Sequence, residues 1–194
     1  MNYMHRFGYF ILSYLLISLL FCGCSADITE KLGSFLELNT DVSVPQIAGD
    51  NPDSQFLLYS IIYINDMSNL FTLADDNLDK SNWKNLITVG RDVTQITQKY
   101  PNQIEDITIS KDLLNFKNEC ATGQVYLNQY GILLESLAKD VNSRGLSFTS
   151  QLSMQAERVD KCRSEGQYHL EQALIELNNI DFNPYLTEWI ENAS

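Results

Sequence analysis

Residues 113–141 read LLNFKNECATGQVYLNQYGILLESLAKDV, and residues 148–177 read FTSQLSMQAERVDKCRSEGQYHLEQALIEL. In both stretches apolar or small residues recur in steps of three and four, which places them on one face of an α-helix. The first set is Leu113, Phe116, Cys120, Gly123, Leu127, Tyr130, Leu134, Leu137 and Val141, and the second is Phe148, Leu152, Ala156, Val159, Cys162, Gly166, Leu170, Ala173 and Leu177. With the polar break at Asn142-Ser143-Arg144-Gly145, the pattern predicts an antiparallel helical hairpin over about residues 110–178.

Two shorter amphipathic patterns precede this hairpin. One begins near Asp53 or Ser54, either of which can cap a helix, and runs to about Asp75. The next begins near Trp83 and is expected to end at Pro101, because proline removes a backbone donor. Short connections between amphipathic helices are typical of bundles. We therefore expect an all-α fold, an antiparallel up-down bundle of about four main helices, with part of the long hairpin projecting as a stalk.

The N-terminus has the composition of an export signal. Arg6 precedes FGYFILSYLLISLLF (residues 7–21), an apolar run that is short for a membrane-spanning helix and suits the core of a signal peptide. Phe21-Cys22-Gly23-Cys24 follows directly. This segment resembles the lipobox of prokaryotic membrane lipoproteins, in which a small residue precedes the cysteine that is lipidated. The resemblance implies cleavage after Gly23 and a lipid on Cys24, although Phe21 stands where lipoboxes usually carry leucine.

Three alternatives to lipidation stay open at this point. Signal peptidase could cut after Ala26 and release a secreted protein, the apolar segment could stay as an uncleaved anchor, or the cysteines could be apolar filler. Under the lipoprotein interpretation, residues 1–23 are the signal peptide, residues 24–52 a membrane-proximal tether and linker, and residues 53–194 the helical domain. The expected location is then the outer side of the cell membrane, extracellular or periplasmic.

Cys120 and Cys162 would be the two thiols left in the mature domain. They lie at similar distances from the break in the hairpin, and paired cysteines in an exported protein are often oxidised. We therefore predict a disulfide between them, with two buried free thiols as the alternative.

The charge of the chain argues against nucleic-acid partners. Its formal net charge is −12, and removal of residues 1–23, which contain Arg6 and no acid, leaves 12 basic against 25 acidic residues, or −13. Such a surface repels phosphate backbones. It also keeps an exported domain soluble.

Few residues in the chain suggest catalysis or metal binding. His169 is the one histidine outside the signal segment, which argues against diiron, zinc and haem sites, and no Gly-x-Ser-x-Gly or phosphate-binding loop occurs. The acidic run at residues 75–82 lacks the glycine and distal glutamate of a calcium loop, so an interhelix turn is favoured. We expect no cofactor and no metal.

Asn65 and Asp66 interrupt an otherwise apolar helix, so a small-ligand pocket is predicted there. The sequence thus favours a lipid-anchored domain with a non-catalytic binding, sensing or scaffolding role, whose partner is an envelope protein or a small ligand. Two alternatives remain. The protein could be a secreted or anchored enzyme that uses carboxylates no motif identifies, or a spacer that self-associates as a coiled coil.

Overall fold

A computed structural model describes residues 44–144, 150–181 and 183–193. The helices in these ranges are α3 (Val44–Ala48), α4 (Pro52–Asp79), α5 (Trp83–Ile104), the 3-10 turn η1 (Lys111–Leu113), α6 (Leu114–Arg144), α7 (Ser150–Asn178) and α8 (Asn183–Ala193). No strand occurs among the described residues. The predicted all-α helical bundle is confirmed. Phe148 falls outside the described ranges.

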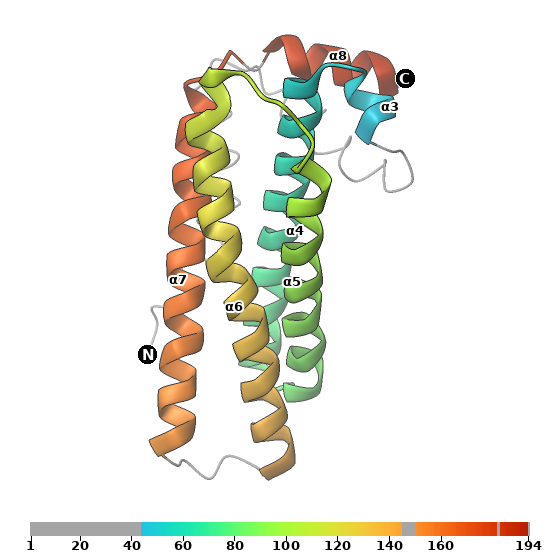
Figure 1. The fold of residues 1–194 in the computed structure, drawn as a ribbon. Helices are drawn as coiled ribbons and strands as arrows, with labels where there is room; N and C mark the ends of the chain where they lie inside the picture. Colours follow the sequence, from blue (N-terminus) through green and yellow to red (C-terminus); the bar gives the residue numbers. More distant parts are fainter. Residues whose placement is uncertain (1–43, 145–149, 182, 194) are drawn as a thin grey trace.

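The four long helices stand side by side, and α8 lies across one end of them beside α3 (Figure 1). Helix α4 is buried over much of its circumference, which explains why its sequence is apolar nearly all round. Phe56 and Phe71 from α4 reach the α6 rings of Phe116 and Tyr130, with ring centroids 5.8 and 6.0 Å apart. The core of the domain therefore lies between α4 and the faces of α5, α6 and α7.

Glycines let α6 approach both of its neighbours. A Cβ placed on Gly131 would lie 2.7 Å from the Gly90 carbonyl oxygen of α5, and one on Gly123 would lie 3.3 Å from the Gly166 carbonyl oxygen of α7. Real Cβ atoms do not approach a backbone oxygen as closely as the first of these distances, so the crossing of α5 and α6 requires glycine at both contact positions.

Helix α5 runs past the residue at which its end was predicted. Pro101 lies inside the helix, which continues to Ile104. Proline has no N–H to donate to the carbonyl four residues earlier, which belongs to Thr97. The Gln124 side chain on α6 donates to that carbonyl from Nε2 at 2.7 Å. The proline therefore costs α5 one internal hydrogen bond, but the Thr97 carbonyl oxygen still has a donor.

The cap of α4 also differs from the prediction. Asn51 caps the helix, with its side-chain oxygen accepting from the Asp53 and Ser54 backbone N–H groups at 3.0 and 3.4 Å, and Pro52 occupies the first helical position. Asp53 instead accepts a 2.7 Å hydrogen bond from the backbone N–H of Ser110. Ser54 Oγ accepts a 2.8 Å hydrogen bond from the Trp189 indole N–H of α8. The side chains of the two residues predicted as caps therefore form hydrogen bonds to other parts of the domain.

Part of the predicted tether belongs to the folded domain. Ile47 and Ala48 of α3 are 2% and 0% exposed, although they fall within residues 24–52, which the sequence predicts to be a tether and linker. Helix α8 covers them: Asn192 donates from Nδ2 to the Ile47 carbonyl oxygen at 2.7 Å. Helix α3 is therefore part of the folded domain, because α8, a partner far away in the sequence, packs on it.

At the other end of the bundle, α6 and α7 extend beyond α4 and α5 (Figure 1). Ala156 belongs to the predicted contact face of α7, yet it is exposed, whereas Val159, one turn further along the same face, is buried. The burial of this face therefore ends between Val159 and Ala156. The projecting stalk expected from helix lengths is therefore present.

Candidate functional site

Polar side chains from different helices meet at several places among the described residues, and one of the most buried lies between α4 and α5. The rings of Tyr63 and Tyr100 stack with centroids 4.3 Å apart and planes 11° from parallel. The Tyr100 hydroxyl lies 2.8 Å from Ser60 Oγ, and Ser60 in turn donates to the Phe56 carbonyl oxygen at 2.8 Å. Tyr63, Tyr100 and Ser60 are all at most 3% exposed. This cluster fixes α4 against α5 in the dry interior.

Cys120 borders the same cluster from α6. Its side chain is 0% exposed, and burial raises the pKa of the thiol to about 12, with a hydrogen bond to Tyr100 acting in the opposite direction. A thiol with such a pKa stays protonated at neutral pH and is a poor nucleophile. Cys120 therefore behaves as a core side chain.

The disulfide predicted between Cys120 and Cys162 is not formed; both are free, buried thiols. The hairpin register explains the error. Glu119 on α6 reaches His169 on α7, so Cys120 faces the same level of α7, and Cys162 lies about seven residues from it, roughly 10 Å along the helix axis. A disulfide requires Cα atoms within about 7 Å. Similar distances from the break did not place the sulfurs opposite each other.

The second place is an ion pair that joins α4 to α7. Arg163 donates from Nη1 and Nη2 to the two carboxylate oxygens of Asp75 at 2.6 and 2.8 Å, and its guanidinium lies 5.2 Å from the centre of the Phe71 ring. The side chains are 13% and 26% exposed. Bidentate geometry with partial burial gives the stronger kind of ion pair. This pair spans the seam between the first and last long helices.

Tyr130 lies beside that ion pair, and its buried hydroxyl has no hydrogen-bond partner among the residues that the structure describes. Burial raises its pKa to about 12; Arg163 lowers it, whereas Asp75 and Asp160 raise it. Tyr63 likewise has a buried hydroxyl without a partner. Unsatisfied buried hydroxyls each cost about 1–3 kcal/mol.

The third place is a half-buried cluster on the hairpin, which we call the His169 cluster: Glu119, Tyr126, Tyr168 and His169. His169 Nδ1 lies 2.7 Å from Glu119 Oε2, with side chains 20% and 32% exposed. The Tyr126 ring stacks on the imidazole at 5.7 Å and 8°, and the Tyr168 ring meets it edge-on at 5.3 Å.

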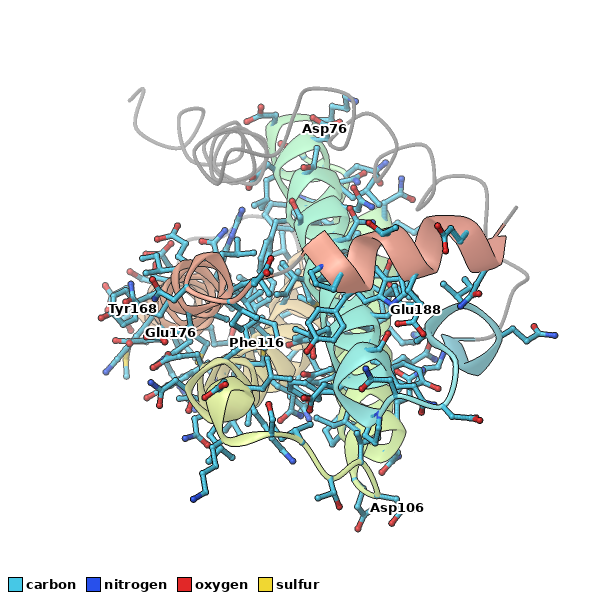
Figure 2. All side chains as sticks on the ribbon, turned by 90° about the horizontal axis from the view of Figure 1, so that it is seen from above. Asp76, Asp106, Phe116, Tyr168, Glu176 and Glu188 are labelled. Atoms are coloured by element: carbon cyan, nitrogen blue, oxygen red, sulfur yellow. The ribbon has the colours of Figure 1, made fainter. Side chains whose placement is uncertain are left out.

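The His169 cluster lies at the surface, where a partner can reach it. Tyr168 is 53% exposed and lies on the outer side of α7, whereas Phe116 points into the core (Figure 2). With Nδ1 engaged by Glu119, the imidazole would make any further hydrogen bond through Nε2. No partner of His169 could be predicted from the sequence, because Glu119 lies just outside the apolar set of α6 and only the hairpin register brings the two residues together.

Asn65 and Asp66 are partly exposed residues of α4. Partial burial raises the pKa of the Asp66 carboxyl, while the positive charge of Lys99 on α5 lowers it. Asp66 is thus close to Lys99 of α5. The ligand pocket predicted at this pair stays a prediction.

No group of three or more potential metal-binding side chains gathers within the described ranges. Among the same residues, no helix combines the length and the apolar composition that a membrane crossing requires. Comparison of the chain with protein-family models, with curated proteins and with solved structures found no match.

Proposed function

We propose that this chain is a lipid-anchored, extracytoplasmic helical domain with a non-catalytic role in binding, sensing or scaffolding at the cell envelope. Its anchor is a lipid on Cys24, and its partner is another envelope protein or a small ligand. The observation that carries the proposal is the order of Arg6, the apolar run 7–21 and Phe21-Cys22-Gly23-Cys24, which together form a signal core ending in a lipobox-like site.

The use of the polar side chains supports a non-catalytic role. Asp75 with Arg163, Glu119 with His169 and Ser60 with Tyr100 each join two different helices. Such pairs between helices fix the packing of the bundle, and no catalytic motif accompanies them in the sequence. Their arrangement is the one expected where side chains hold a binding or scaffolding surface in shape.

The experiment that tests the proposal is the intact mass of the protein recovered from the membrane fraction of the producing cell. We expect a chain that starts at Cys24 and carries a lipid increment. Cys24→Ala should abolish the increment and release the protein from membranes, while the matched control Cys22→Ala should retain both. An unlipidated chain that starts at Asp27 would overturn the anchoring proposal and make this a secreted domain.

A further inference from the structure

The two long helices of the hairpin approach each other closely beneath the His169 cluster. A Cβ placed on Gly123 of α6 would lie 3.3 Å from the Gly166 carbonyl oxygen and 3.3 Å from the His169 Cβ on α7. The imidazole and the Tyr126 ring stacked on it therefore lie over the seam of α6 and α7, where both side chains stay partly exposed. Tyr168 beside them is 53% exposed, so much of its ring is open to contact from outside.

The contact between His169 and Glu119 decides which hydrogen bond the imidazole can still make. A carboxylate only accepts hydrogen bonds, so Nδ1 carries the proton in its 2.7 Å contact with Glu119 Oε2. In the neutral imidazole, Nε2 then holds a lone pair and acts as an acceptor. The side chain of His169 is 20% exposed. The cluster therefore offers a partner one hydrogen-bond acceptor beside two aromatic rings.

Carboxylates flank this acceptor along the seam. Glu165 and Glu176 lie four residues before and seven residues after His169, on the same face of α7. Asn115 of α6 donates from Nδ2 to Glu176 Oε2 at 3.5 Å, so Glu176 also reaches across to α6. Together with Glu119, these side chains give the aromatic surface a negative charge.

Basic side chains near the cluster in the sequence are directed elsewhere or lie farther along the hairpin. Lys117 of α6 lies over a phenylalanine ring of α4, and Arg163 of α7 pairs with a carboxylate of α4. Lys161 and Arg158 lie eight and eleven residues before His169, which is about 12 and 16 Å along the axis of α7. These cations leave the negative charge of the cluster available to a partner.

A guanidinium is the partner group that fits this surface best. It is planar and carries five N–H donors, so it can stack on an aromatic ring while it donates to an acceptor and to carboxylates. The ammonium of lysine is a compact, strongly hydrated charge that stacks less well. The net charge of −12 also attracts a basic partner from a distance.

We propose that the His169 cluster is a docking surface for an arginine-bearing segment of a partner protein. The guanidinium lies against the Tyr168 ring, donates to His169 Nε2 and pairs with the carboxylates beside it. The inference rests on the binding role proposed above. It is independent of the lipid anchor, because every residue of the surface belongs to the folded domain.

Peptide titration against the full chain tests this assignment. The protein is purified in a neutral detergent, and the probes are fluorescent pentapeptides in which two arginines flank a leucine, together with lysine and citrulline versions. Citrulline keeps the shape of arginine without its charge. We expect the arginine peptide to bind several-fold tighter than the lysine peptide, and the citrulline peptide to bind far more weakly than either.

Substitutions at exposed positions locate the binding. Tyr168→Ala should weaken binding of the arginine peptide about two- to fivefold, the loss expected for an exposed cation–π contact, and Tyr168→Phe should keep the affinity because the ring remains. Met154→Ala is the matched control, since Met154 is 63% exposed on the same helix, fourteen residues away. Circular dichroism and thermal unfolding check that each variant is folded.

The imidazole itself provides a second readout in the unsubstituted protein. His5 is the one other histidine of the chain, so His169→Gln assigns the imidazole nitrogen signals in NMR spectra. We expect the arginine peptide to shift the Nε2 resonance of His169, and the citrulline peptide to leave it unchanged.

Equal affinity for the arginine and lysine peptides, an unchanged affinity in Tyr168→Ala, or an unmoved Nε2 resonance would overturn the docking surface. Spermidine that binds as tightly as the arginine peptide would indicate a polyamine site and overturn the assignment to a protein segment. The anchor is judged separately, by the mass of the membrane-bound chain. A lipidated chain that does not bind the arginine peptide overturns the docking surface alone, and an unlipidated chain that binds it overturns the anchor alone.

Discussion

Gln124 Nε2 donates at 2.7 Å to the Thr97 carbonyl oxygen, the acceptor that Pro101 leaves without a partner inside α5. Gln124 and Thr97 are 27 positions apart in the sequence. The side chain from α6 replaces the hydrogen bond that the proline removes from α5. Thr97 itself is 0% exposed, so water offers its carbonyl little compensation.

We predict that Gln124→Leu lowers the free energy of unfolding by about 1–3 kcal/mol, the cost of an unsatisfied buried acceptor. In the Pro101→Ala background the same change should cost clearly less, because residue 101 then supplies an N–H to the Thr97 carbonyl. Urea denaturation of the four proteins of this double-mutant cycle measures the coupling. Gln129→Leu, at an exposed position of α6, is the control for the general effect of the substitution. Equal losses in both backgrounds would show that Pro101 and Gln124 are independent.

Gly131→Ala should destabilise the fold by about 1–3 kcal/mol, because the new methyl group would lie 2.6 Å from Thr94 Oγ1 and 2.7 Å from the Gly90 carbonyl oxygen. Gly123→Ala is the matched comparison, since its nearest contacts are at 3.3 Å and alanine improves helix propensity by about 1 kcal/mol. We expect Gly123→Ala to be near neutral in thermal unfolding. A reversed order of the two variants would mean that α6 packs against α5 less closely than described.

Arg163→Met should cost about 3 kcal/mol in urea denaturation, because it leaves the Asp75 carboxylate partly buried without its partner. Adding Asp75→Leu should restore much of the loss, since a buried pair replaced by apolar groups removes the uncompensated charge. The control is Arg91→Met, whose ion pair with Glu135 involves an arginine side chain that is 52% exposed and should contribute less than about 1 kcal/mol. Similar losses at positions 163 and 91 would contradict a special role for the α4–α7 seam.

Asp66 should make stability fall as the pH rises. Burial raises its pKa above the ordinary value of 3.8, so between that value and the higher folded pKa the native state binds more protons than the unfolded state. The free energy of unfolding from this group is therefore highest below pH 3.8 and declines until the pH passes the folded pKa. Asp66→Asn should remove this decline and raise stability at pH 7 by less than about 1 kcal/mol, because the carboxyl is partly solvated. Denaturation across pH 3–7 measures the difference, and parallel curves for the two proteins would contradict it.

The spacing of apolar residues was sufficient to predict the helices and their inward faces. Leu113, Phe116 and Leu127 are buried as the steps of three and four require. Periodicity reports which residues face inward along one helix, but it carries no information about the level at which two helices meet. For that reason the sequence pattern led to the wrong prediction of a disulfide between Cys120 and Cys162. The contact between Glu119 and His169 was not predicted.

The ends of elements were harder to predict, because they depend on distant partners. Pro101 is tolerated within α5 through Gln124, and α3 is buried through α8. A local rule treats proline as a helix end and a polar stretch as a linker. Both rules failed where another part of the chain supplied the missing hydrogen bond or the missing cover.

The hydrogen bond between Trp189 and Ser54 joins residues 135 positions apart. During synthesis from the N-terminal side, α3 and the start of α4 therefore wait for α8 before their final contacts can form. A product that stops short of α8 leaves Ile47 and Ala48 uncovered, an apolar surface of the kind that chaperones and proteases recognise. The buried contacts of α3 and of the start of α4 thus depend on the synthesis of α8, a helix far away in the sequence.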